Sequence, residues 1–151
     1  MILQDWLKNG WLIEHKSSPA EISELLALVE RDLSDCRIQD LSSDWRLNIA
    51  YNAALQAATA ALAASGYRAS RESHHYRVIQ SLSLTIGADQ NLVRQFDMFR
   101  RKRNIGGYER VGLVSDLEAD EMIDLAEKLK KEVINWLASQ HAELFQEYSS
   151  P

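Results

Sequence analysis

The stretch from Leu47 to Tyr67 constrains the fold more than any other part of the chain. It has no charged side chain, it contains nine alanines between Ala50 and Ala64, and Gly66 follows them. Alanine is the strongest helix former, and glycine favours the C-terminal end of a helix. We therefore predict a helix over about residues 44–65 that neighbouring helices can approach closely. Its Asn, Gln, Thr and Ser content favours a packed helix of a soluble domain over a membrane span.

Four further helices are predicted from capping signals and apolar spacing. The first begins at Ser18-Pro19-Ala20-Glu21, a capping box with proline at the first helical position. Two more span about residues 70–86 and 89–106, and each is followed by glycine. The last opens with a second capping box at 115–118, and its inner face is Met122, Leu125, Ala126, Leu129, Val133, Trp136 and Leu137. Strand signals are not found. The expected fold class is all-α, an up-and-down bundle of four to five helices.

A length of 151 residues predicts one domain with a single core. We expect residues 1–18 to form a segment that packs on the bundle, residues 19–145 to form the bundle, and 146–151 to form a tail. One cysteine, Cys36, excludes an internal disulfide and suggests a reducing compartment. Without a basic leader or a membrane span, a cytoplasmic location is expected. The histidines and Cys36 do not have the sequence spacing of a typical metal site, so neither a metal nor a cofactor is expected.

Charge is distributed unevenly along this acidic chain, whose net charge is −5. Residues 94–110 hold six cations against two carboxylates, a local charge of +4, and residues 115–147 hold nine carboxylates against three lysines, a local charge of −6. This pattern indicates either self-complementary packing or two different partners, and any nucleic-acid binding must be local.

The basic run Arg100-Arg101-Lys102-Arg103 ends the helix predicted over 89–106. The apolar face of that helix is Leu92, Phe96 and Phe99, and the next position on it is Arg103. We expect Arg103 to point inward and Arg101 and Lys102 to face solvent. A buried guanidinium needs a carboxylate, backbone carbonyls or a bound anion, and the sequence leaves these three open.

A histidine is expected near the same end of the bundle. His75, Ile79, Leu82 and Ile86 share one face of the helix predicted over 70–86, so His75 points inward. A short connection makes this helix and the next antiparallel neighbours, which brings His75 close to Arg103. A satisfied core histidine remains the alternative for His75. Its neighbour His74 is expected to be exposed.

The segment Arg103-Asn104-Ile105-Gly106-Gly107-Tyr108, at the end of the penultimate long helix, resembles the motif of the HEPN superfamily. That motif is an arginine, a polar residue, three variable residues and a histidine. The resemblance covers roughly residues 20–140 and includes the alanine-rich helix ending in Gly66-Tyr67-Arg68 and the turn His74-His75-Tyr76. It implies a helical bundle with RNA-directed or nucleotide-associated function. Many members resemble metal-independent endoribonucleases that act as dimers, often as toxins paired with a nucleotidyltransferase antitoxin.

The resemblance implies roles for individual residues. Arg103 would stabilise charge on a scissile phosphate, and Asn104 would orient the arginine or the substrate. Tyr108 stands where the family has its proton-transferring histidine. A tyrosine with a pKa of about 10 is a poor general base at pH 7. Counted from Arg101, Tyr108 falls instead on a tyrosine that partner enzymes modify in some members, and Gly106 replaces the histidine.

These observations predict a HEPN-like protein that binds RNA or a nucleotide, with weak or no nuclease activity, as a homodimer with a nucleotidyltransferase as a candidate partner. The expected binding residues are Arg100, Arg101, Lys102, Arg103, Arg110 and His74, and the candidate catalytic residues are Arg103, Asn104, Tyr108 and His75. Three alternatives stay open. One is an active endoribonuclease with His75 as substitute proton shuttle, and another is a purely structural motif. The third is an interaction module using the acidic last helix, Trp6 and Trp11, or the tail Leu144, Phe145 and Tyr148.

Overall fold

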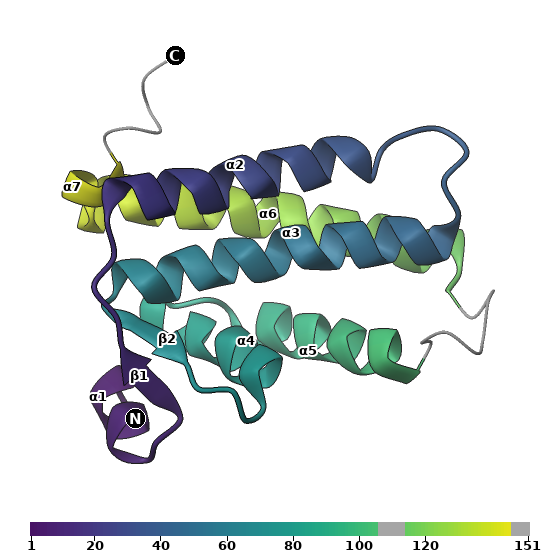
Figure 1. Cartoon of the computed structure of the whole chain (residues 1–151). Coiled ribbons are helices and arrows are strands. Elements are labelled where there is room, and N and C mark those ends of the chain that lie inside the picture. The colour runs from purple at the N-terminus through teal and green to yellow at the C-terminus, as the bar shows by residue number, and fades with distance from the viewer. Residues whose placement is uncertain (106–113, 146–151) are drawn as a thin grey trace.

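The computed structural model describes residues 1–105 and 114–145, and this part of the chain is mostly helical (Figure 1). The all-α fold class predicted from the sequence is confirmed. The elements in chain order are α1 (Leu3–Lys8), β1 (Leu12–Glu14), α2 (Pro19–Asp35), α3 (Ser43–Ala64), β2 (Tyr67–Ala69), α4 (His74–Thr85), α5 (Gln90–Ile105), α6 (Asp116–Gln140) and α7 (Ala142–Phe145).

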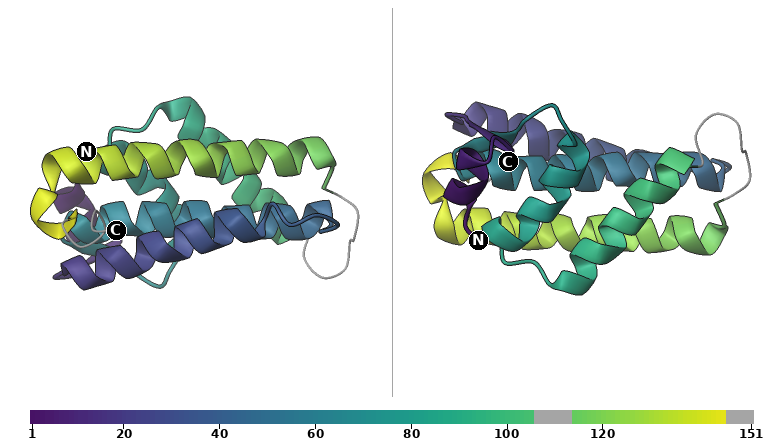
Figure 2. Two further views of the ribbon diagram at one scale, coloured as in Figure 1. Left: turned by 90° about the horizontal axis from the view of Figure 1, so that it is seen from above. Right: turned by 90° about the horizontal axis from the view of Figure 1, so that it is seen from below.

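Three long helices, α2, α3 and α6, run side by side along the length of the molecule. Helices α4 and α5 lie against α3 on the side away from α2, and they cross the long helices obliquely in the view from below (Figure 2). Helix α3 contacts α2, α4, α5 and α6, so it forms the centre of the bundle. No helix among the described residues is both long and apolar enough to pass through a lipid bilayer.

The small alanine side chains of α3 allow four other helices to pack against it. Ala50, Ala53, Ala57 and Ala61 have no exposed surface, and other alanines of α3 are equally buried. A methyl side chain allows a close approach between helix axes, and a close-packed interior tolerates little extra volume there. This agrees with the prediction that the alanine-rich stretch is a tightly surrounded helix.

A short two-stranded sheet was not predicted from the sequence. β1 pairs with β2 in antiparallel register, with Leu12 opposite Ala69 and Glu14 opposite Tyr67. Each strand has three residues, which is too short for an apolar/polar alternation to be recognised. The pair holds the N-terminal segment, including α1, beside the α3–α4 connection (Figure 1).

Both predicted N-terminal caps are present, but only one is a complete capping box. In α6, Ser115 accepts from the Glu118 backbone N–H while the Glu118 carboxylate accepts from the Ser115 N–H. In α2, Ser18 accepts from the Glu21 N–H, but the Glu21 carboxylate contacts His15 and Ser17 instead. The difference arises because the chain before α2 brings His15 within reach of that carboxylate.

Candidate functional site

Arg103 lies in the last turn of α5 and is half-buried against α3. Its Nε donates a hydrogen bond to Oδ1 of Asn48 over 3.0 Å, and its guanidinium carbon lies 4.9 Å from the centre of the Tyr51 ring. The inward direction predicted from helical spacing is therefore observed. No carboxylate within residues 1–105 and 114–145 lies at ion-pair distance from Arg103. Neutral groups, an amide and a phenol ring, hold this charge in place.

Tyr51 connects three helices at this point. It is fully buried in α3, its ring packs edge-to-face against Phe96 of α5 at 5.6 Å, and its hydroxyl lies 3.2 Å from Nδ1 of His75 on α4. Burial raises the pKa of Tyr51 to about 12, although the charges of Arg103 and Arg100 oppose the rise. The phenol therefore keeps its proton throughout the physiological range.

His75 is brought next to Arg103 through Tyr51, as the antiparallel arrangement of the two helices predicts. Burial lowers the pKa of His75, and the nearby charges of Arg103, His74 and Arg100 lower it further. The imidazole is therefore neutral at pH 7. A protonated phenol needs an acceptor, and among the described residues His75 Nδ1 is the partner of the Tyr51 hydroxyl. We assign Nδ1 as the acceptor, which leaves the ring proton on Nε2.

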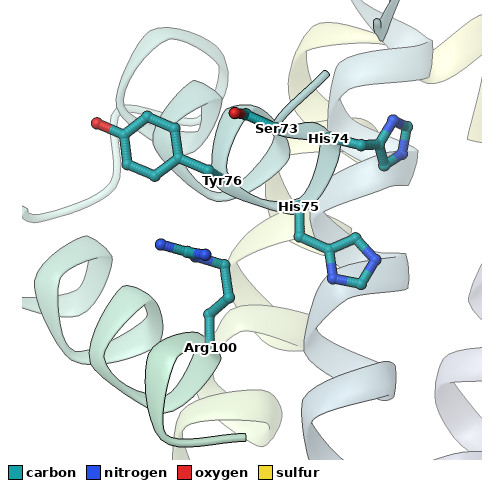
Figure 3. Close-up of a pocket in the computed structure, with 5 residues that line it drawn as sticks. All are labelled: Ser73, His74, His75, Tyr76 and Arg100. Carbon is teal, nitrogen blue, oxygen red and sulfur yellow. The ribbon is translucent and has the colours of Figure 1, made fainter. Parts of the chain in front are cut away.

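An open pocket with a volume of about 490 Å³ lies beside His75 (Figure 3). Its lining residues are Ser73, His74, His75, Tyr76 and Arg100. The first turn of α4 forms one wall, and Ser73 before it adopts a left-handed conformation with φ 54° and makes no side-chain cap. The first backbone N–H groups of a helix have no partner within the helix, so this wall presents donors as well as imidazoles.

Arg100 forms the opposite wall of the pocket, a position that was not predicted from the sequence. Arg100 and Arg103 are three residues apart on α5 and so lie on nearly the same side. The Arg100 side chain is 21% exposed, its Nε donates to Asp97 Oδ1 over 2.7 Å, and its guanidinium carbon lies 5.5 Å from the Tyr76 ring centre. Arg100 therefore lines the pocket, whereas Arg103, held by Asn48 and Tyr51, is not among its lining residues.

The remaining predicted site residues differ in their exposure and in their contacts. Arg101 is exposed, as predicted, with Asp97 3.5 Å from its Nε. Lys102 does not face open solvent but forms an ion pair with Glu118 at the start of α6. His74 is exposed, as predicted, and lines the pocket. The side chain of Asn104, together with Tyr108 and Arg110, lies outside the described residues.

Four residues of the site were missed by sequence reasoning. Asn48 and Tyr51 hold Arg103, Asp97 holds Arg100, and Tyr76 lines the pocket. One signal for Asn48 and Tyr51 is present in the sequence. They lie three residues apart in the charge-free, alanine-rich helix, where polar groups large enough to reach a neighbouring helix are few.

The surfaces expected for a protein-interaction module are partly used within the chain. Trp6 is buried, and Trp11 stacks under the guanidinium of Arg77 at 3.7 Å. Leu144 and Phe145 are half-buried against the core. Acidic residues of α6 pair with cations of other helices, namely Asp120 with Arg46, Glu118 with Lys102, and Glu127 with Arg37. The uneven charge of the sequence is thus in part self-complementary packing.

Within the described residues, no group of three His, Cys, Asp or Glu side chains could hold a metal ion. No protein-family model matches the chain, and neither a curated protein nor a solved structure is significantly similar to it.

Proposed function

We propose that this protein binds the phosphate groups of RNA or of a nucleotide at the site formed by Arg100, Arg103 and His75, as a HEPN-like protein with weak or no nuclease activity. The observation that carries the proposal is the setting of Arg103. Its charge is held in a fixed direction by Asn48 and Tyr51, and no described carboxylate neutralises it. A preoriented guanidinium without a carboxylate suits phosphate recognition.

The groups around Arg103 support the same ligand. Arg100 keeps its terminal nitrogens available, because the hydrogen bond to Asp97 uses Nε. His75 presents a neutral imidazole with its proton on Nε2, and the start of α4 presents backbone N–H groups. All of these are hydrogen-bond donors. A site composed of donors matches a phosphate, whose oxygens are acceptors only.

Binding of a short fluorescent RNA, followed by anisotropy in the presence of a chelator, tests this proposal. We expect Arg103→Ala and Arg100→Ala each to weaken binding at least about tenfold, since hydrogen bonds to charged groups are strong. Each change should also reduce the salt dependence by about one phosphate contact. The matched control is Arg94→Ala, which removes an exposed arginine at the other end of α5. RNA binding unchanged in both Arg100 and Arg103 variants contradicts the proposal.

A second candidate function is metal-independent RNA cleavage, and the position of His75 favours it. Tyr108 replaces the histidine of the motif, but His75 supplies an imidazole on the other side of Arg103, linked to it through Tyr51. As a neutral imidazole, His75 would act as a base rather than an acid, and it would accept a proton at Nδ1 only when the hydrogen bond from the Tyr51 hydroxyl opens. Incubation with RNA in chelator, followed by analysis for cyclic-phosphate ends, tests this candidate. No cleavage, or cleavage that is unchanged in Arg103→Ala, contradicts this candidate.

We further propose that the chain is a homodimer in which two Arg103 residues face one groove, and that a nucleotidyltransferase is its partner. Both parts come from the resemblance of residues 103–108 to the HEPN motif. Light scattering tests the dimer directly, and a monomer at all accessible concentrations rejects it. Copurification with a coexpressed nucleotidyltransferase tests the partner.

A further inference from the structure

We propose that Tyr76 and Arg100 form a subsite for an unpaired nucleobase beside the phosphate site, so that the ligand is recognised through a base as well as through phosphate. This inference rests on the function proposed above and names a recognition element that neither the motif nor the basic run contains.

The Tyr76 side chain is partly exposed to solvent. The residue is 36% exposed and lines the pocket together with Arg100 (Figure 3). The guanidinium carbons of Arg77 and Arg100 lie 5.4 Å and 5.5 Å from its ring centre, whereas Arg77 stacks on Trp11 at 3.7 Å. Both guanidinium groups lie over the Tyr76 ring within cation–π distance, but farther from it than Arg77 lies from Trp11. An aromatic face next to arginine is a sequence-tolerant surface for a base.

The subsite is held in position by the N-terminal segment. Arg77, the neighbour of Tyr76, lies over the Trp11 ring and within 5.7 Å of the Trp6 ring centre. The backbone carbonyl of Trp11 also accepts a hydrogen bond from the backbone N–H of Ser70, just before the first turn of α4. These contacts fix the turn that carries Tyr76, so stacking of a base would cost little ordering of the protein.

A nucleobase is favoured over other planar ligands because donors for phosphate lie in the same pocket. Arg100 and His75 line the same pocket as Tyr76, and the Arg100 guanidinium points toward the Tyr76 ring (Figure 3). A pocket volume of about 490 Å³ falls within the range of small-ligand sites. A nucleotide unit has a planar base, which would stack on Tyr76, and an anionic phosphate, which would accept hydrogen bonds from Arg100 and His75.

The test compares two fluorescent oligomers of equal length and charge, a single-stranded RNA and an abasic ribose-phosphate chain. Loss of base stacking weakens binding by about 5- to 150-fold per base. We expect the wild-type protein to bind the RNA more tightly than the abasic chain by a factor in this range. Tyr76→Ala should reduce RNA affinity to the abasic level without affecting the abasic chain. Tyr76→Phe, which keeps the ring, should bind as the wild type does.

The outcomes separate this inference from the function on which it rests. Equal binding of both oligomers by the wild type, or unchanged RNA affinity in Tyr76→Ala, overturns the base subsite and leaves phosphate binding standing. An equal loss for both oligomers in Tyr76→Ala also overturns it, because the ring then acts on the phosphate site. If neither oligomer binds, the proposed function fails and the subsite fails with it.

Discussion

At the scale of single residues, the setting of Arg103 differs from that of most half-buried arginines. A guanidinium inside a bundle is ordinarily matched by a carboxylate, since an unpaired charge away from water is costly. Here an amide oxygen and the face of a phenol take that place among the described residues. Both are weaker partners than a carboxylate, and neither cancels the positive charge. The positive charge of Arg103 therefore affects neighbouring groups, and it contributes to the lowered pKa of His75.

The pKa of His75 provides a measure of that charge. We expect Arg103→Met to raise the pKa of His75 towards the ordinary value of about 6.5, because one of the cations that oppose imidazolium formation is removed. NMR titration of the ring protons measures the shift. Arg94→Met is the control and should leave the pKa of His75 unchanged. An unchanged value in Arg103→Met means that Arg103 does not act on the imidazole.

The same residue makes stability depend on pH. The folded pKa of His75 lies below its unfolded value, so the unfolded chain takes up the proton more readily. The contribution of His75 to the free energy of unfolding is complete above about pH 6.5 and is lost as the pH falls below that value. In urea unfolding experiments, the free energy of unfolding should decrease less for His75→Gln than for the wild type as the pH falls from 8 to 5. An equal decrease in both proteins argues against this linkage.

Tyr51 predicts an opposite dependence at alkaline pH. Its folded pKa of about 12 exceeds the unfolded value of about 10, so the unfolded chain loses its proton first. The free energy of unfolding should therefore decrease between pH 10 and 12, with a slope against pH that corresponds to at most one proton. Tyr51→Phe should lack that part of the fall, whereas Tyr76→Phe, a change at an exposed ring, serves as control. The measurement is the free energy of unfolding in urea as a function of pH.

At the scale of secondary-structure elements, α3 determines how closely the bundle packs. A leucine at Ala57, which has no exposed surface, must displace neighbouring helices or adopt a strained rotamer. We expect Ala57→Leu to lower the free energy of unfolding by about 1–3 kcal/mol, measured by urea denaturation. Ala27→Leu, at an exposed position of α2, should change it by less than about 0.5 kcal/mol. Similar values for the two variants would show that α3 is not tightly surrounded.

Helices were predictable from the sequence because their signals are local. The serine caps at residues 18 and 115 and glycines 66 and 87 mark helix ends to within a few residues, and the periodic apolar faces mark which side is buried. The start of α4 was placed at residue 70 rather than at His74, because residues 67–69 pair with β1. That pairing joins segments more than fifty residues apart, and no local pattern contains it.

The candidate site was predictable only in part, for the same reason. Helical spacing and the short connection between the two helices were enough to predict that Arg103 and His75 lie near each other. The same spacing also places Arg100 only about 60° from Arg103, so its burial could have been inferred. Lys102 is different, because its pairing with Glu118 depends on where α6 begins relative to the end of α5. Asn48 and Tyr51 could be assigned roles only once α3 and α5 were known to be in contact.

At the scale of the whole molecule, the N-terminal segment is attached through few elements. β1 pairs with β2, α1 packs on β1, and Trp11 lies under Arg77. We expect Trp11→Ala to increase hydrogen exchange in β1, β2 and the first turn of α4, and to leave α3 and α6 unchanged. Trp45→Ala, at a side chain that is 62% exposed, is the control and should change neither region. Exchange that increases throughout the bundle would show that the segment is part of the global folding unit.

The buried phenol of Tyr51 touches groups from α4 and α5 while belonging to the central helix. The arrangement of Arg103, Tyr51 and His75 therefore depends on contacts between three helices, and it exists only while these helices are assembled. Occupancy of this place by any ligand should consequently raise the melting temperature of the entire bundle, in proportion to the logarithm of ligand concentration. A thermal-shift screen of phosphorylated compounds therefore tests the proposed phosphate binding directly.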